Sequence, residues 1–226
     1  MTISNDSRTR IKKIFEPIAL GLGRLGLTPD ALTVVGFVIT VVGAVLVAQQ
    51  LWLAGGLVIL FGGVFDLFDG TLARATGRVS RLGAFMDSVF DRAGEVVVYL
   101  GVIIGLQGVG VVNGAALAAA AMGSATLVSY VRAKSEGLGF TAGAGMAAIG
   151  IMPREVRLII ISLGLVLAGL LPTLPDTTCT TCAGGGSLTS GAFALLIALA
   201  LIALGSILTV IQRILHVRQQ ARRQST

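Results

Sequence analysis

Long apolar stretches, separated by short polar connections, run through most of the chain. Hydropathy places six of them at residues 31–49, 51–72, 83–107, 111–133, 155–172 and 191–213. Each is close to the roughly 20 residues that a helix needs to cross a bilayer. We therefore expect an all-α, polytopic membrane protein with six transmembrane helices. The whole chain, 1–226, is predicted to form a single membrane domain, with a six-helix bundle over residues 31–215.

The connections at 49–50 and 107–113 are short, which predicts antiparallel hairpins of the first two and of the next two membrane helices. Residues 5–25 have a different pattern, with apolar side chains on one face and basic ones elsewhere. This pattern predicts an interfacial amphipathic helix on the cytoplasmic surface, whose simplest role is an anchor. It is interrupted at Thr28-Pro29-Asp30, where Thr28 or Asp30 is placed to cap the first membrane helix.

Composition supports the membrane prediction. The chain is 54% hydrophobic and 12% charged, with a mean hydropathy of +0.91, which is too apolar for a soluble domain of this size. The 31 glycines and few aromatic residues predict helices that approach closely through small side chains. The charged N-terminal segment has no apolar core directly behind it, so we expect the first membrane helix to act as an uncleaved insertion signal.

The distribution of basic residues predicts the orientation. All 17 lysines and arginines lie before the first span, near the connections between spans two and three and between spans four and five, or after the sixth span. By the positive-inside rule, both termini and this face are cytoplasmic, in a multi-pass protein of the cell membrane. The net charge of +6 therefore describes one face, which we expect to meet anionic headgroups and anionic solutes. No nucleic-acid partner is expected.

Two pairs of aspartates interrupt the apolar stretches. Asp66 and Asp69 lie in the second span, and Asp87 and Asp91 lie in the third. A charged side chain near the centre of the bilayer costs at least about 3 kcal/mol, so a group of carboxylates indicates a partner that offsets the cost. Oxygen ligands without nearby His or Cys favour Mg²⁺, Mn²⁺ or Ca²⁺ over zinc or copper. Two ions about 3.5–4 Å apart, as in two-metal sites, can be bridged by such a set.

The spacing of these acids places each pair on one helix face. Residues 66, 69, 70 and 73 follow an i, i+3, i+4, i+7 progression, and 83, 87 and 91 are one turn apart. Because the connection between the two helices is short, we expect the two stripes to converge near the cytoplasmic boundary. Gly70, Ala73 and Gly83 leave the helix surface bare there, so a large anionic ligand can lie against the backbone.

Other candidate chemistry is weaker. No phosphate-binding loop of the Walker type and no Ser-His-Asp set can be assembled. Cys179 and Cys182 form a CxxC in the external loop, where a local disulfide or idle thiols fit better than zinc. His216, the only histidine, is expected to face solvent or headgroups.

Two other protein classes compete with an enzyme. A divalent-cation or proton transporter also carries intramembrane carboxylates, but here the acids cluster at one end and few polar residues continue a path. A structural scaffold would need no ion, and replacing its aspartates with Asn would then be stabilising.

The motif Asp66-x-x-Asp69-Gly70-x-x-Ala73-Arg74, then eight residues, then Gly83-x-x-x-Asp87-x-x-x-Asp91, resembles the signature of the CDP-alcohol phosphatidyltransferases. The resemblance implies that Asp66, Asp69, Asp87 and Asp91 hold two divalent cations, Mg²⁺ first and Mn²⁺ as the alternative, which grip the diphosphate of CDP-diacylglycerol. It also implies that Asp91 takes the proton of the incoming hydroxyl, and that the protein is a homodimer. The residues it assigns to the CDP-lipid pocket are Asp30, Thr33, Gly70, Ala73, Arg74, Ser80 and Gly83.

Three further stretches, 129–136, 153–160 and 212–213, are similar to the phosphatidylinositol phosphate synthase branch of that family. The similarity implies a basic pocket for the phosphate of a phosphorylated polyol, since arginine and lysine bind phosphate dianions. Its residues are Arg132, Lys134, Arg154, Arg157 and Arg213. Arg154 and Arg157 also fit the positive-inside pattern without such a role. The reaction expected is phosphatidyl transfer to inositol 1-phosphate with release of CMP; glycerol 3-phosphate is the close alternative acceptor.

Overall fold

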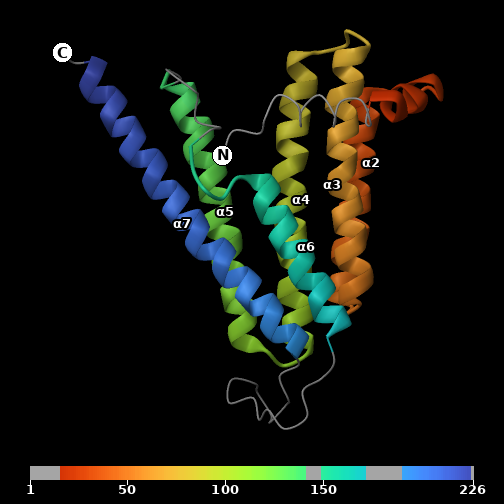
Figure 1. The fold of residues 1–226 in the computed structure, drawn as a ribbon, viewed down its shortest axis with the longest axis vertical. Helices are drawn as coiled ribbons and strands as arrows, with labels where there is room; N and C mark the ends of the chain where they lie inside the picture. Colours follow the sequence, from red (N-terminus) through yellow and green to blue (C-terminus); the bar gives the residue numbers. More distant parts are fainter. Residues whose placement is uncertain (1–15, 141–148, 172–189, 225–226) are drawn as a thin grey trace.

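The computed structural model describes residues 16–140, 149–171 and 190–224, and within these ranges all regular structure is helical (Figure 1). A short helical segment at 16–24 comes first. The helices that follow are α2 (Pro29–Ala48), α3 (Trp52–Ala75), α4 (Arg81–Gly108), α5 (Val112–Gly137), α6 (Arg154–Leu170) and α7 (Ser190–Gln224). Each of the six predicted apolar stretches is therefore a helix.

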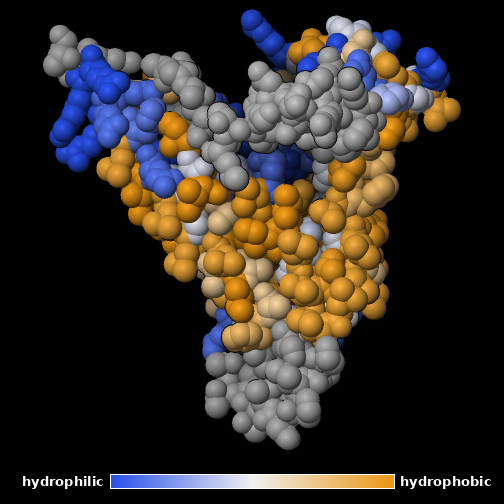
Figure 2. Space-filling model, in the orientation of Figure 1, coloured by the Kyte–Doolittle hydropathy of each residue, from blue (hydrophilic) through white to orange (hydrophobic). Residues whose placement is uncertain are grey.

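Four of these helices, α2, α3, α5 and α7, are long and apolar enough to cross a membrane. α6 has 17 residues, and α4 carries the charged residues Asp87, Asp91, Arg92 and Glu95 before its apolar C-terminal part. α7 continues well past the predicted end of its span, through a polar stretch rich in Gln and Arg, which are good helix formers. Figure 2 shows a broad apolar surface band, with hydrophilic side chains gathered at the end that carries the C-terminus.

The helices pack in a closed ring of neighbours. α2 contacts α3 and α4, α6 contacts α3 and α7, and α5 contacts α4 and α7. The two predicted hairpins, α2–α3 and α4–α5, are thus confirmed as packed pairs. α3 and α4 follow one another in the chain but are not among the closely packed pairs of the described residues. Their facing sides are therefore open to side chains from α6.

Glycines allow α2 and α3 to approach closely. A Cβ atom at Gly55 would lie 2.9 Å from both the carbonyl oxygen of Gly43 and the amide nitrogen of Val47. Such a contact is too short for a real side chain, so this crossing requires glycine. The close approach is the one predicted from the small residues of these stretches.

The N-terminal ends of α2 and α4 are fixed by side-chain caps. The hydroxyl of Thr28 accepts a hydrogen bond from the Ala31 amide at 3.2 Å, with Pro29 in the first turn, so Thr28 rather than Asp30 caps α2. The hydroxyl of Ser80 accepts one from the Gly83 amide at 2.8 Å and caps α4. These caps set where the aspartate-bearing turns begin.

The predicted amphipathic helix at 5–25 lies partly outside the described residues. Its described part, 16–24, is helical and lies across the end of α2 (Figure 1). Ala19 is fully buried in a small cluster with Leu32, Phe68 and Leu72, and Leu22 packs against that cluster. This segment is therefore fastened to the bundle at the end of α3 that carries Asp69.

Candidate active site

The four predicted aspartates lie in the same part of the bundle. Asp66 and Asp69 come from α3 and Asp87 and Asp91 from α4, and Asp66 and Asp87 are near enough to act electrostatically on both other carboxylates. The predicted convergence of the two stripes is therefore found. It is found without direct packing of α3 on α4, so other side chains fill the space between the helices.

Asp69 is the most enclosed of the four, with 5% of its surface exposed. The hydroxyl of Thr33, on α2, donates a hydrogen bond to its Oδ2 at 2.6 Å, and the Gly70 amide donates to its Oδ1. These bonds hold the carboxylate in one orientation. Thr33 is itself buried, so α2 contributes directly to the geometry of the acidic stripe on α3.

Arg154, the first residue of α6, joins the two stripes. Its Nη2 lies 2.7 Å from Oδ2 of Asp66, and its Nη1 lies 2.8 Å from Oδ1 of Asp91. One guanidinium thus links α3 to α4. The three side chains are between 15% and 25% exposed, so water can still reach the bridge.

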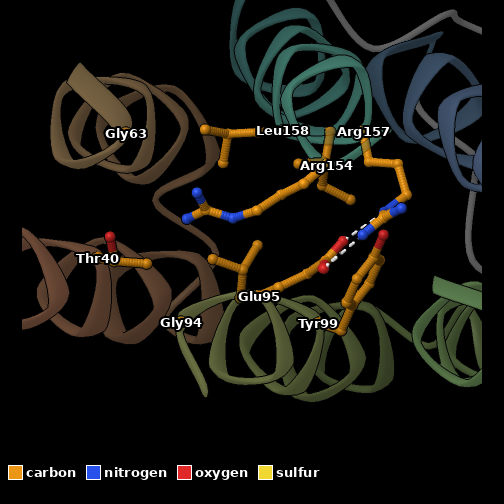
Figure 3. A pocket seen from close by; sticks show the side chains of 10 residues that line it. Thr40, Gly63, Gly94, Glu95, Tyr99, Arg154, Arg157 and Leu158 are labelled. Atoms are coloured by element: carbon orange, nitrogen blue, oxygen red, sulfur yellow. Dashed lines mark hydrogen bonds and ion pairs between the residues drawn. The ribbon is translucent and has the colours of Figure 1, made fainter. Parts of the chain in front are cut away.

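One helical turn deeper, a second arginine pairs with α4. Arg157, with 1% of its surface exposed, donates from Nε to Oε1 of Glu95 at 2.6 Å and from Nη2 to Oε2 at 2.8 Å. Its Nη1 also donates to the carbonyl oxygen of Met152 at 2.9 Å. Figure 3 shows Arg154 and Arg157 extending from α6 and Glu95 and Tyr99 from α4. The pair fastens the start of α6 to α4.

A small cavity of about 20 Å³ lies between these arginines, lined by both of them, Glu95 and Tyr99 among others. The hydroxyl of Tyr99 is buried and has no hydrogen-bond partner among the described residues. The space is large enough for one water molecule, and the polar lining offers it partners.

A larger cavity of about 300 Å³ opens beside Asp69 and Asp87. Its lining contains all seven residues assigned to the CDP-lipid pocket: Asp30, Thr33, Gly70, Ala73, Arg74, Ser80 and Gly83. A Cβ atom at Gly83 would lie 3.0 Å from the hydroxyl of Ser80 and 3.1 Å from Oδ1 of Asp30, so this glycine keeps the cavity open. Pro29, Arg78, Val79 and Ala84 complete the lining.

The five basic residues assigned to the acceptor phosphate do not line one common cavity. Arg154 and Arg157 share the small cavity described above. Arg213 is 3% exposed, and it donates to the carbonyl oxygens of Val128 at 2.6 Å and Ile149 at 3.0 Å. Arg132 pairs with Glu136 at 3.0 Å, and the exposed Lys134 lines a separate cavity between α5 and α7. Their assignment to the acceptor stays a prediction.

The donor set suits a divalent cation in kind, because four carboxylates on facing stripes supply the hard oxygen ligands that Mg²⁺ and Mn²⁺ prefer. Among the described residues, no three His, Cys, Asp or Glu side chains converge closely enough to hold an ion as they are placed. The guanidinium of Arg154 lies between the carboxylates of Asp66 and Asp91. The donors therefore fit a divalent cation in their chemistry, while Arg154 is the partner of two of them as the side chains are placed.

Sequence reasoning missed Glu95 and its pairing with Arg157. The signal was present, since Glu95 continues the 87–91 stripe by one more turn into an apolar stretch. Cys179 and Cys182 lie outside the described residues. His216 is half-buried, and its Nε2 lies 2.8 Å from Nε2 of Gln220.

Comparison with known proteins gives consistent matches. The family model described as CDP-alcohol phosphatidyltransferase matches residues 26–218. A phosphatidylinositol phosphate synthase of Cutibacterium acnes is 36% identical over 215 residues, covering 92% of this chain and 93% of that protein. An archaetidylinositol phosphate synthase of Pyrococcus horikoshii is 33% identical over 154 residues, covering 68% and 77%.

The fold is also similar to a solved structure, that of Mycobacterium tuberculosis phosphatidylinositol phosphate synthase. The form with CDP-DAG bound superposes with a TM-score of 0.71 at 30% identity, covering 91% of this chain and 94% of that one. The form in complex with manganese and citrate also gives a TM-score of 0.71 at 30% identity, covering 90% and 88%. These are proteins that this chain is similar to in both sequence and fold.

Proposed function

The chain belongs to the CDP-alcohol phosphatidyltransferase family, whose model spans residues 26–218, and we propose that it makes phosphatidylinositol phosphate from CDP-diacylglycerol and inositol 1-phosphate. The family assignment made from the aspartate motif is confirmed, and with it that the protein is an enzyme of phospholipid biosynthesis. The choice of donor and acceptor is the proposal. It is supported by relatives that are named phosphatidylinositol phosphate synthases.

The observation that carries the donor half of the proposal is the cavity of about 300 Å³ beside Asp69 and Asp87. Arg74 and Arg78 supply positive charge on its lining, and Gly70 and Gly83 leave room for a bulky anionic group. A diphosphate bound there would lie next to both acidic stripes. The related Mycobacterium tuberculosis structure has CDP-DAG bound, which supports the same class of donor here.

Asp66, Asp69, Asp87 and Asp91 would hold two divalent cations, Mg²⁺ in the first instance and Mn²⁺ as the alternative. The family uses divalent metals, and the related structure with manganese supports this assignment. When bound, such ions supply positive charge that stabilises the negative charge developing on the diphosphate oxygens. The remaining steps fall to side chains of this chain.

In the proposed reaction the hydroxyl oxygen of the acceptor forms a bond to the lipid-side phosphorus, the bond from that phosphorus to the bridging oxygen breaks, and CMP leaves. Asp91 takes the hydroxyl proton, which requires its carboxylate to lie within hydrogen-bond distance of that hydroxyl. Thr33 and the Gly70 amide hold Asp69 in a fixed orientation. The lining of the larger cavity positions the donor, so the rate depends mainly on orientation and charge.

For the acceptor, we propose that Arg154 makes the main contact with the phosphate group, because among the five basic residues assigned to the acceptor it is the one paired with Asp91. Lys134 and Arg132 would add positive charge from the end of α5. Arg157 and Arg213 would support the pocket from their buried positions at the start of α6 and on α7. Glycerol 3-phosphate, which would give phosphatidylglycerophosphate, remains the alternative because it carries the same phosphate dianion.

We propose that all six helices α2–α7 cross the membrane, with both termini and the site on the cytoplasmic face. The short α6 and the charged α4 would cross as part of the closed ring, where α2 and α5 pack on α4, and α3 and α7 pack on α6. The segment at 16–24 would lie in the interface, and a homodimer is proposed from the family.

The test is an acceptor panel. Purified protein with CDP-diacylglycerol and Mg²⁺ or Mn²⁺ is given inositol 1-phosphate, glycerol 3-phosphate, serine or free inositol, and CMP and lipid products are measured. Inositol 1-phosphate should give the highest kcat/KM. Preference for glycerol 3-phosphate would replace the proposed acceptor, and the absence of CMP release with every phosphorylated alcohol would overturn the proposal. An Asp91→Asn variant that retains full activity would reject Asp91 as the base.

A further inference from the structure

Two arginine bridges of different character connect α4 and α6. On α4, Asp91 and Glu95 are four residues apart, and on α6 Arg154 and Arg157 are three apart, so each pair of side chains lies on one helix face. Arg154 bonds Asp91 and Arg157 bonds Glu95, one turn deeper in the bundle. The two bridges are therefore neighbours, but their surroundings and bonds differ.

The deeper bridge is complete in itself. Both oxygens of Glu95 accept from Arg157, whose remaining Nη1 donates to Met152, and the arginine is 1% exposed. Separating such a pair would leave a buried charge without its partner, which is strongly unfavourable. The ion pair of Arg157 and Glu95 therefore holds the start of α6 in a fixed position against α4.

The outer bridge joins Arg154 to two residues that also have a proposed role in metal binding. Arg154 holds Asp66 and Asp91 and is 25% exposed, so its guanidinium has solvent beside it. Its two partners are the carboxylates proposed as metal ligands. Guanidinium stays protonated in proteins, so Arg154 and a divalent ion cannot both occupy the space between these oxygens without strong repulsion.

We propose that Arg154 is an exchangeable counter-ion for the aspartate site. It links Asp66 to Asp91 and thereby α3 to α4, and it is displaced when divalent ions bind. The side chain of Arg154 then rotates while Arg157 keeps the start of α6 in place, and the guanidinium of Arg154 becomes available to an anionic group beside Asp91. The inference rests on the proposed function for the identity of that anion, the phosphate of the acceptor.

The bridge makes an unusual prediction for the Arg154→Gln variant. Without the guanidinium, the carboxylates repel one another in the absence of metal, and no cation has to be displaced when metal binds. Mn²⁺ should therefore bind more tightly, by about tenfold, the factor that corresponds to one charge-assisted hydrogen bond. The variant should also gain more in unfolding temperature from saturating Mn²⁺ than the unmodified protein does.

Arg92→Gln is the matched control. Arg92 also lies near Asp91, but at 3.6 Å and with 37% of its side chain exposed, and its Nη1 donates to the carbonyl oxygen of Ser88. Its removal takes away the same charge but leaves the link between Asp66 and Asp91 intact, so Mn²⁺ affinity should change by less than about twofold, as expected for an exposed pair. Arg154→Lys keeps the charge but cannot span both carboxylates in the same way. Its Mn²⁺ affinity should therefore lie between those of Arg154→Gln and Arg92→Gln.

The measurements are Mn²⁺ titration by electron paramagnetic resonance and thermal unfolding with and without Mn²⁺, on full-length protein in detergent without CDP-lipid. Unchanged Mn²⁺ affinity in Arg154→Gln, or an effect equal to that of Arg92→Gln, overturns the exchange. So does a variant that stays unfolded in saturating Mn²⁺, because the role would then be structural. Folding that is rescued by Mn²⁺ supports it. These readouts require no turnover, so a failed acceptor panel would reject the proposed function without deciding this inference.

Discussion

Replacing Glu95 with Gln should strongly destabilise the protein, although Glu95 is not itself a proposed metal ligand and lies four residues beyond one. The substitution keeps the size of the side chain but removes its charge and turns one acceptor into an NH₂ donor. Arg157 is 1% exposed and cannot move its guanidinium into water. The guanidinium of Arg157 would retain its hydrogen bond to the carbonyl oxygen of Met152 and one hydrogen bond to the oxygen of the new amide. Its other nitrogen donor would face the NH₂ group of that amide, which is also a donor.

The magnitude follows from the burial of the pair. Removing one partner of a buried ion pair costs about 3–5 kcal/mol. Here one hydrogen bond survives and the cavity of about 20 Å³ can admit a water, so we expect the lower end, about 3 kcal/mol. At about 2–4 °C per kcal/mol for a chain of this size, the unfolding temperature should fall by about 6–12 °C.

The assay is thermal unfolding in detergent, with Glu136→Gln as the matched control. Glu136 also pairs with an arginine, Arg132, at 3.0 Å, but both side chains are about two-fifths exposed. That helical pair should contribute only about 0.3–0.5 kcal/mol, or about 1–2 °C. A Glu95→Gln variant that is no less stable than the control would refute the reasoning. Adding Arg157→Met should recover part of the loss, because no buried charge is then left unpaired.

Three further predictions concern the site itself. Thr33→Val removes the 2.6 Å hydrogen bond to Asp69 and should weaken Mn²⁺ binding by about 10–100-fold, as loss of a bond to a metal ligand typically does; titration of the variant tests this. Gly83→Ala places a methyl group 3.0–3.1 Å from two atoms of the cavity wall and should raise KM for CDP-diacylglycerol more than it lowers kcat, whereas Gly137→Ala, with nothing within 4 Å, should leave both unchanged. Chelation with EDTA should abolish CMP release, and Mg²⁺ or Mn²⁺ should restore it to the unmodified protein but not to Asp91→Asn.

Much of this arrangement follows from patterns that are local in the sequence. Apolar length predicts each of the six helices, and the four-residue spacing of Asp87 and Asp91 predicts the face they share. The resemblance to the family predicts the seven residues that line the larger cavity, which come from the start of α2, the last turns of α3 and the start of α4. For the helices and their faces, the sequence of one helix determines the geometry.

The rest depends on which helices become neighbours, and periodicity does not specify that. It places Asp66 and Asp91 on helix faces but does not indicate that α3 and α4 would stand apart, with Arg154 from α6 between them. The pairing of Arg157 with Glu95 joins residues 62 positions apart. From the sequence alone, a basic residue on a predicted cytoplasmic face serves equally well as a topology signal, a phosphate ligand or a partner for a buried acid.

The order of acids along α4 explains how the site can change its contacts while the bundle stays fixed. Asp87, Asp91 and Glu95 repeat every four residues, so their Cα atoms are about 6 Å apart along the helix. The first lines the larger cavity, the second shares Arg154, and the third is locked to the buried Arg157. Because the locked pair is one turn from the exchangeable one, release of Arg154 needs only side-chain rotation. The helices that carry the ligands can therefore keep their packing while the counter-ion changes.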